Sequence, residues 1–327
     1  MTMMNIVQAI NQALKSEMEK DDRVILLGED IGKNGGVFRA TDQLFDQFGE
    51  KRVVDTPIAE SAIIGAAVGM AARGLRPVAE IQFMGFIYEA MDQMAAQAAR
   101  LRFRSGGTQT APMVIRAPYG GGIRAPELHS DSLESAFAHS PGLKVVMPSN
   151  PYDAKGLLIA AMRDPDPVLF LEPMKLYRAF QEEVPEEEYT IEIGKANRLR
   201  EGEDLTIITW GPPVHTVKLV AEKWWEEKGV SIEVIDLRTV APLDIETIVA
   251  SVEKTEHVII VHEAVKTGGV GAEIAALISE KALYSLSAPI LRVTGYDTPY
   301  PTAMVEEEWL PNEKRINEAI TAVLDEE

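Results

Sequence analysis

Glu60 is the carboxylate whose setting in the sequence points most directly to chemistry. Thr56-Pro57 ends an extended segment, because proline disfavours helical backbone in the residue before it. The residues that follow, 61–72, are mostly small and apolar on every face, which predicts a helix packed on all sides. A helix dipole stabilises an anion at its N-terminus by only ~0.3–1 kcal/mol, whereas an unpaired buried carboxylate costs considerably more. Glu60 therefore needs a partner, either backbone N–H groups that it caps or a nitrogen atom of a bound ligand.

Other polar side chains follow predicted strands in the first half of the chain. Glu29 comes just after the apolar run 24–27, and Gln82 lies near the end of the extended segment 76–83. Ligands of α/β proteins bind at the carboxyl ends of the strands, although such residues also simply fill loops. His129 lies in the loop 117–131, which is too rich in glycine and proline for regular structure. These residues predict a polar crevice but do not specify a reaction.

Several common kinds of site are excluded or disfavoured. The chain has no cysteine, and its five histidines lack the spacing of metal ligands. Neither a Walker A motif nor a Gly-x-Ser-x-Gly elbow is present. Gly269-x-Gly271 resembles half of a dinucleotide-binding fingerprint, but Ile274 stands where the fingerprint needs glycine or alanine. A Rossmann oxidoreductase is therefore disfavoured, and these glycines are interpreted as a flexible helix start.

The composition is that of a soluble globular protein. The 327 residues are 46% hydrophobic, with a mean hydropathy of -0.05. The net charge of -19 argues against binding to nucleic acid or to an anionic membrane surface. No segment has the length and apolarity of a membrane span, and the N-terminus lacks the features of a signal peptide. We expect a cytoplasmic protein, in keeping with the absence of cysteine.

Predicted strands and helices alternate along both halves of the chain, which indicates parallel sheets covered by helices on both faces. The predicted helices are 5–20, 40–48, 61–73, 86–104, 151–163, 214–228, 245–253, 272–282 and 312–324. The predicted strands are 24–27, 76–83, 112–116, 144–147, 168–171, 205–209, 231–235, 257–262 and 290–293. The alternation lapses between 172 and 204. We therefore expect an α/β protein with two doubly wound domains, residues 1–185 and 186–327.

A series of short motifs runs in fixed order along the whole chain. They are Asp55-Thr-Pro-Ile-Ala-Glu60, Glu80-Ile-Gln-Phe83, Ser105-Gly-Gly, Gly120-Gly-Gly, Glu127-Leu-His-Ser130, Pro148-Ser-Asn-Pro-Tyr-Asp153, Asp236-Leu-Arg-Thr and Pro242-Leu-Asp244. With these motifs the chain resembles the β subunits of the first component of 2-oxo acid dehydrogenase complexes, most of all the pyruvate dehydrogenase β subunits of Gram-positive bacteria. The resemblance implies a thiamine diphosphate pyrimidine-binding domain followed by a transketolase-like domain.

The resemblance also implies an activity and a partner subunit. Together with an α subunit, in an α2β2 heterotetramer, the chain would decarboxylate pyruvate oxidatively and pass the acetyl group to lipoyl groups of the acyltransferase core. Glu60 would hydrogen-bond N1′ of the cofactor's aminopyrimidine, a bond to a charged group that contributes ~1.5–3 kcal/mol. The other residues implied to surround or support the ring are Glu29, Ile58, Gln82 and Phe86. His129 would face the substrate channel as a candidate for proton transfer during acetyl transfer.

Two departures from the family pattern bear on ions and on one site residue. Many members have glutamine where this chain has Asp131, so the role of residue 131 stays open. The Gly-Asp-Gly motif that binds magnesium and diphosphate in thiamine enzymes is absent, which implies that Mg²⁺ is held mainly by the α subunit and that the β chain alone is inactive. The resemblance also implies a structural potassium site, formed largely by backbone carbonyls, at Met113, Ala161, Met162, Asp164 and Asp166. The alternative is that these residues form a plain loop.

The acidic runs Glu306–Glu308 and Asp325–Glu327 suggest a further partner. In the family the β C-terminal domain docks the basic subunit-binding domain of the dihydrolipoyl acetyltransferase, and surface charge would make that encounter salt-sensitive. Two alternatives stay open. The chain is a β subunit of a branched-chain 2-oxo acid or acetoin dehydrogenase, because substrate contacts come largely from the α chain, or it is a non-catalytic assembly subunit.

Overall fold

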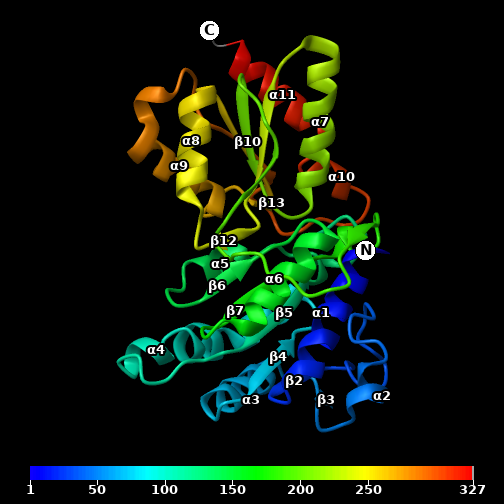
Figure 1. The fold of residues 1–327 in the computed structure, drawn as a ribbon. Helices are drawn as coiled ribbons and strands as arrows, with labels where there is room; N and C mark the ends of the chain where they lie inside the picture. Colours follow the sequence, from blue (N-terminus) through cyan, green and yellow to red (C-terminus); the bar gives the residue numbers. More distant parts are fainter. Residues whose placement is uncertain (326–327) are drawn as a thin grey trace.

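The computed structural model describes residues 1–325, so that Glu326 and Glu327 of the second acidic run lie outside the described residues. The described chain forms two lobes, one above the other in Figure 1. The N-terminal lobe contains the sheet built on β2 to β7, and the C-terminal lobe contains the sheet built on β9 to β14 without β12. No helix in residues 1–325 is long and apolar enough to cross a membrane.

The sheet of the N-terminal lobe is parallel except at one edge. Its strands, in spatial order, are β12 (Thr239–Ala241), β6 (Lys144–Val146), β7 (Val168–Pro173), β5 (Val114–Tyr119), β4 (Arg76–Glu80), β2 (Val24–Gly28) and β3 (Val53–Asp55). Successive residues of β4 face opposite layers: Val78 packs in the core cluster with Ile10, and Ala79 packs in the cluster with Ile63. This alternation is the reason that the strands are apolar on both faces.

Helices cover both faces of this sheet. Helices α1 (Ile6–Lys20) and α6 (Pro151–Arg163) share one core cluster, and α3 (Glu60–Ala72) shares the other with the segment that follows β4. Asn5 caps α1 with its side chain, and Asn150 does the same for α6. Short helices α2 (Leu44–Phe48), α4 (Leu101–Arg104) and α5 (Glu134–Ala138) complete the lobe.

The C-terminal lobe repeats the plan with a smaller sheet. Its strands, in spatial order, are β14 (Leu291–Gly295), β13 (Val258–Val265), β10 (Leu205–Thr209), β11 (Ile232–Asp236) and the antiparallel edge strand β9 (Asn197–Arg200). Helices α7 (Pro213–Lys228) and α11 (Glu313–Leu324) pack on one face, and α8 (Ile245–Thr255) and α9 (Val270–Ala282) pack on the other. The short α10 (Glu306–Trp309) lies between β14 and α11 in the sequence.

The two lobes share a sheet edge. Strand β12 comes from the second half of the chain but pairs antiparallel with β6 of the N-terminal lobe. Next to it, Arg238 donates to both carboxylate oxygens of Asp153, at 2.7 and 2.6 Å. A separate pair of strands, β1 (Thr2–Met4) and β8 (Glu182–Val184), lies at the end of the first half. Residues 185–191 still contact α6, through Lys155 and the Gly156 carbonyl, and β9 of the second lobe begins at Asn197. The division at 185/186 stays a prediction.

The α/β class with two doubly wound halves is confirmed, and two predicted helices are wrong in extent. Of the predicted helix 40–48, only α2 is helical. The predicted helix 86–104 is broken into a 3-10 helix (Met84–Ala90), a π-helix (Asp92–Ala98) and α4. The tight first turn brings Gly85 under the Leu128 carbonyl, where a Cβ atom would lie 1.9 Å from the oxygen. We therefore attribute the break in the helix to the packing of loop 120–131 against Gly85. This loop is distant in the sequence.

Candidate active site

The predicted site residues of the N-terminal lobe come together at the carboxyl edge of its sheet. Glu29 follows β2, Gln82 follows β4, and Glu60 is the first residue of α3, which begins after β3. Parallel strands bring their carboxyl ends to the same edge, where α/β proteins bind ligands. The structure thus places these side chains at one edge of one sheet, as predicted.

Glu60 is only half-buried in the single chain, so the expectation of a buried carboxylate is wrong for the subunit alone. Its carboxylate makes no hydrogen bond within the described residues. No backbone N–H and no cation in residues 1–325 lies within bonding distance of it, and the N-cap residue Ala59 offers no side-chain cap. Glu29 and the Gln82 amide are likewise without a hydrogen-bond partner in the described chain. The capping alternative for Glu60 is therefore not observed.

Glu29 lies within electrostatic reach of Glu60. Partial burial raises the pKa of the Glu29 carboxyl, and the negative charges of Asp30 and Glu60 raise it further. Two carboxylates that share a region in this way favour retention of a proton at one of them.

Helix α3 is not covered on all sides in the chain alone, so that prediction is wrong for the single subunit. One face is exposed and carries Ser61, Ala62, Ala66, Gly69 and Ala72. Ile58, just before the helix, exposes 74% of its surface. The opposite face is buried through residues such as Ile63 and Ile64. An apolar helix with one open face calls for a covering partner.

His129 is held by two aromatic rings. The Phe83 ring lies 4.4 Å from the imidazole, centroid to centroid, and the Phe86 ring lies at 5.2 Å, both roughly edge-on. The Nδ1 atom of His129 is buried without a hydrogen-bond partner in the described chain. The sequence analysis predicts Phe86 for this site but places Phe83 only at the end of a strand. The position of Phe83 in the motif Glu80-Ile-Gln-Phe83 is the sequence feature that could have indicated its role.

A buried network of ion pairs lies next to the site, and the sequence analysis does not predict it. Arg116 of β5 pairs with Glu80 of β4 at 2.7 Å, and with Glu172 of β7 at 2.6 and 3.0 Å. Tyr177 donates its hydroxyl to Glu172 at 2.5 Å. Burial raises the pKa of Glu80, against the lowering effect of Arg116. The network links three adjacent strands next to the edge that carries Gln82.

The residues of the predicted potassium site lie close together but are engaged with protein groups. Asp164 pairs with Lys144, and Asp166 accepts from Arg102 at 2.7 Å. The Met162 carbonyl accepts from Arg76 at 2.7 Å, the Met113 carbonyl from Val168 N at 3.0 Å, and the Ala161 carbonyl from Asp164 N at 3.2 Å. In residues 1–325 no group of three or more His, Cys, Asp or Glu side chains is arranged to hold a metal ion. A potassium site therefore stays a prediction and depends on backbone carbonyls.

The glycines of the broken fingerprint have a packing role. Helix α9 begins at Val270, and a Cβ atom on Gly271 would lie 2.6 Å from Nε2 of the buried His262. The His262 ring stacks on Trp210 at 4.9 Å. These glycines make room for the histidine at the start of the helix.

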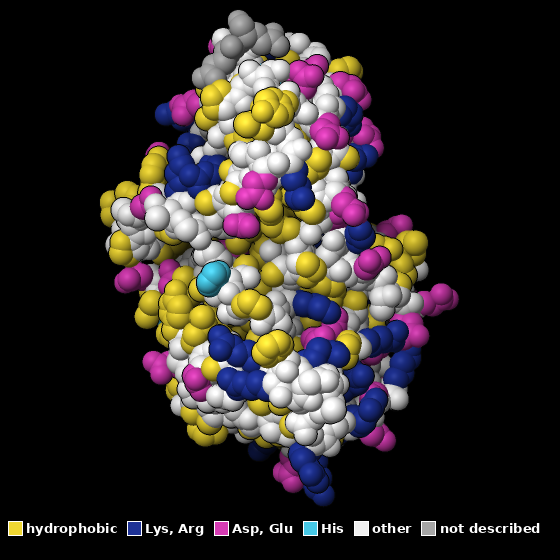
Figure 2. All heavy atoms as spheres, turned by 90° about the vertical axis from the view of Figure 1, so that its left-hand side faces the viewer, with side chains coloured by type: hydrophobic (Ala, Val, Ile, Leu, Met, Phe, Trp, Pro, Cys, Tyr) yellow, Lys and Arg dark blue, Asp and Glu magenta, His cyan; other side chains and the backbone are white. Residues whose placement is uncertain are grey.

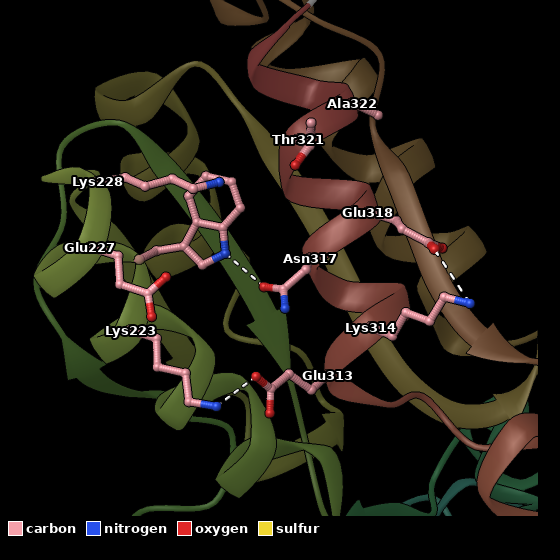
Figure 3. Close-up of a pocket in the computed structure, with 10 residues that line it drawn as sticks. Lys223, Glu227, Lys228, Glu313, Lys314, Asn317, Glu318, Thr321 and Ala322 are labelled. Atoms are coloured by element: carbon pink, nitrogen blue, oxygen red, sulfur yellow. Dashed lines mark hydrogen bonds and ion pairs between the residues drawn. The ribbon is translucent and has the colours of Figure 1, made fainter.

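A large groove lies elsewhere, between α7 and α11 (Figure 3). It measures about 950 Å³ and is lined by side chains of both helices, including Lys223 and Glu313, which pair at 2.6 Å. None of the predicted site residues lines it. A second hollow of about 870 Å³ lies beside α4, where Phe103 is 89% exposed. On that side of the molecule, apolar side chains gather in the zone between the lobes (Figure 2).

Comparison with known proteins identifies the class. Residues 2–179 match the family described as transketolase, pyrimidine binding domain, and residues 194–316 match transketolase, C-terminal domain. A solved split-gene transketolase, described as an inactive β4 tetramer, superposes with a TM-score of 0.80 at 22% identity, covering 98% of both chains. A transketolase from Leishmania mexicana gives a TM-score of 0.72 at 14% identity and covers 99% of this chain and 46% of that one. The fold and the two matches define a two-domain chain of the transketolase class.

Full-length relatives narrow the class to one family. The chain is 58% identical to the pyruvate dehydrogenase E1 component subunit beta of Staphylococcus epidermidis and 57% identical to that of Bacillus subtilis. Both comparisons cover 99% of this chain and 100% of the relative. The chain belongs to the family of pyruvate dehydrogenase E1 component β subunits. The predicted family and fold are confirmed, and the roles of individual residues stay predictions.

Proposed function

We propose that the chain, together with an α subunit, forms the decarboxylating component of a cytoplasmic pyruvate dehydrogenase complex. This enzyme carries out thiamine diphosphate-dependent oxidative decarboxylation of pyruvate and passes the acetyl group to lipoyl groups of the dihydrolipoyl acetyltransferase. Support comes from the identity of 57–58% to pyruvate dehydrogenase E1 β subunits over the whole chain. The structural observation that carries the proposal is Glu60, a carboxylate at a helix start with no partner in the described chain and with Glu29 beside it.

The N-terminal lobe fits the aminopyrimidine end of thiamine diphosphate. Glu60 holds a proton at N1′ of that ring, and Gln82 and Phe86 are proposed to contact the ring. Ile58 is exposed and available to the same ligand, and Glu29 is proposed to be an acid that lies behind Glu60. Bound thiamine diphosphate supplies the electron sink for the carbanion left by decarboxylation. Because the Gly-Asp-Gly motif is absent, we assign the diphosphate and Mg²⁺ to the α subunit.

His129 is proposed to move a proton during acetyl transfer. Phe83 and Phe86 fix the orientation of its ring, and its Nδ1 atom is free of protein hydrogen bonds in the described chain. A positioned imidazole contributes about 10²–10⁴-fold to a proton-transfer step. Pyruvate itself is decarboxylated before this step, so loss of His129 should reduce transfer to lipoyl groups more than decarboxylation.

The exposed face of α3 supports assembly with an α subunit. This face carries small residues beside Glu60, and Ile58 is exposed next to it. Small side chains let another subunit approach the helix closely and bring further groups to the cofactor. We propose the α2β2 heterotetramer on this basis and on the names of the relatives. A potassium ion on the carbonyls of Met113, Ala161 and Met162 would be a structural element of the same lobe.

The test is the substitution Glu60→Gln in the reconstituted complex with the α subunit. We expect pyruvate decarboxylation, measured with an artificial electron acceptor, to fall by about 10²–10⁴-fold. Glu50→Gln, at an exposed position of the same lobe, is the matched control. Wild-type rates in Glu60→Gln would overturn the catalytic role. Assay of pyruvate against branched-chain 2-oxo acids tests the substrate.

A further inference from the structure

Loop 120–131, which carries His129, is held by the C-terminal lobe. The loop begins with Gly120, Gly121 and Gly122, and the backbone N–H groups of this turn point to side chains from the other half of the chain. Gly121 N donates to Glu263 of β13, and Gly122 N donates to Glu306 at 3.0 Å. The predicted functional histidine thus follows a turn whose geometry is set by a different lobe.

Glu306 is a buried acceptor for three donors. One oxygen, Oε1, accepts from Gly122 N at 3.0 Å, from Arg124 N at 3.2 Å and from the Tyr300 hydroxyl at 2.7 Å. Only 3% of the residue is exposed. The prediction that all of Glu306–Glu308 forms a surface charge is therefore wrong for its first residue. A carboxylate that accepts several N–H bonds in a dry setting fixes the backbone that donates them.

Glu263 is the second buried acceptor and is 4% exposed. The charged groups that face it are Lys175 from the N-terminal lobe and the carboxyls of Glu134 and Glu306. Burial raises the pKa of Glu263 to about 7, in spite of the bond from Gly121 N and the nearby Lys175. The two acceptors therefore lie side by side at the lobe junction and act on consecutive N–H groups of one turn.

The close fit of the turn requires glycine. A Cβ atom on Gly121 would lie 1.7 Å from the Tyr300 hydroxyl oxygen, and one on Gly120 would lie 3.0 Å from Oε1 of Glu263. Gly120 and Gly122 also have positive φ angles, of 83° and 84°, which glycine adopts at little cost. The backbone of the turn lies directly against the second lobe.

The other end of the loop is fixed to the site. Gly120 N donates to the Asp131 carbonyl at 3.2 Å, which closes the base of the loop. The Leu128 carbonyl packs on Gly85, and the His129 ring packs on Phe83. Between these fixed points lie only a few residues, so a shift of the turn moves the histidine.

We propose that Glu263 and Glu306 are positioning residues for His129, through which the C-terminal lobe sets the geometry of the acetyl-transfer step. The proposal rests on the function proposed above. The two carboxylates do not touch substrate or cofactor; they hold the turn that determines where the imidazole lies. A role confined to joining the lobes would instead lower decarboxylation and acetyl transfer together.

The experiment compares Glu306→Gln and Glu263→Gln with Glu280→Gln in the reconstituted complex. Glu280 is an exposed acid of α9 in the same lobe and serves as the control. Hydrogen exchange of the peptide containing 120–131, followed by mass spectrometry, reports on the loop without any need for activity. The ratio of lipoyl acetylation to decarboxylation with an artificial acceptor reports on His129, with His129→Ala as the reference.

We expect both variants to show faster exchange in loop 120–131. The ratio of lipoyl acetylation to decarboxylation should fall at least fivefold, as in His129→Ala, and Glu280→Gln should leave both measurements unchanged. Glu306→Ala, which removes the acceptor oxygen altogether, should have a larger effect than Glu306→Gln. Unchanged exchange overturns the proposal, and so does an unchanged ratio when His129→Ala lowers it. If His129→Ala leaves the ratio at the wild-type value, His129 does not have the role assigned to it under the proposed function. Faster exchange in the two glutamate variants would then still show that Glu263 and Glu306 position loop 120–131.

Discussion

The carboxyl groups of Glu29 and Glu60 lie close enough for the charge of one to raise the pKa of the other. The two residues follow different strands and meet only because β2 and β3 are parallel neighbours. Neither carboxylate is neutralised by a cation in the described chain. The titration of Glu29 should therefore respond to substitution of Glu60.

Glu60→Gln should lower the pKa of Glu29. Burial, the largest cause of the upward shift, remains, as does the charge of Asp30, so we expect a partial return toward the ordinary value. Carboxyl-carbon NMR titration of isotope-labelled protein measures the change. The control Glu50→Gln should leave the pKa of Glu29 unchanged. An unchanged pKa of Glu29 in Glu60→Gln would show that the two charges do not interact.

Gly85→Ala should destabilise the fold. The new methyl group would meet the Leu128 carbonyl at 1.9 Å, so the 3-10 turn or loop 120–131 must move, at a cost of about 1–3 kcal/mol. Gly69→Ala in α3 has no atom within 4 Å of the new Cβ and should stabilise the helix by roughly 0.5–1 kcal/mol. Urea denaturation measures both. Equal effects of the two substitutions would contradict the close packing of the loop.

Arg116→Met should destabilise the N-terminal lobe strongly at neutral pH. Removing the arginine leaves Glu80 and Glu172 buried without their partner, and breaking a buried pair in this way costs about 3–5 kcal/mol. The loss should shrink as pH falls and the two carboxyls become protonated. Arg23→Met removes an exposed pair with Asp21 and should have no measurable effect. Denaturation at several pH values distinguishes the two cases.

Glu263→Gln should flatten the pH dependence of stability. The pKa of Glu263 is raised by burial from 4.5 to about 7, so the folded state retains the proton more firmly than the unfolded state. Its contribution to stability is full below about 4.5 and is lost as pH rises to about 7. The free energy of unfolding of Glu263→Gln, relative to wild type, should therefore increase from pH 5 to pH 8. A difference that stays constant over this range would refute the assignment.

Substitution of the exposed acids Glu307 and Glu308 by lysine should weaken docking of a basic subunit-binding domain. The two residues retain the surface charge predicted for this run, since only Glu306 is buried. We expect a several-fold slower association and a weaker salt dependence. Binding kinetics at roughly 0.01 M and 1 M ionic strength test this. Wild-type binding that does not respond to salt would rule out docking by charge.

Local sequence patterns were sufficient for the elements that carry the site. Apolar runs predict β2 and β4 at the correct positions. Thr56-Pro57 ends the preceding extended segment, which correctly predicts Glu60 at the start of α3. These features depend on residues close together in the chain, whose conformation proline, glycine and hydrophobic periodicity determine directly.

Contacts between distant segments could not be predicted in this way. The packing of His129 on Phe83 and the break in the helix after β4 both depend on loop 120–131 folding back over Gly85. The Glu306 carboxylate accepts hydrogen bonds from the backbone of Gly122 and Arg124, which lie more than 180 residues earlier in the chain. In the sequence Glu306 is the first of three consecutive glutamates and cannot be distinguished from its exposed neighbours.

The strand exchange at β12 constrains how the protein can be divided. Cutting the chain at residue 185 would remove β12 and leave β6 as a bare sheet edge. Unpaired edges recruit strands from other molecules, so a truncated first half should self-associate. Co-expression of the second half, which supplies β12 from a separate chain, should suppress that self-association.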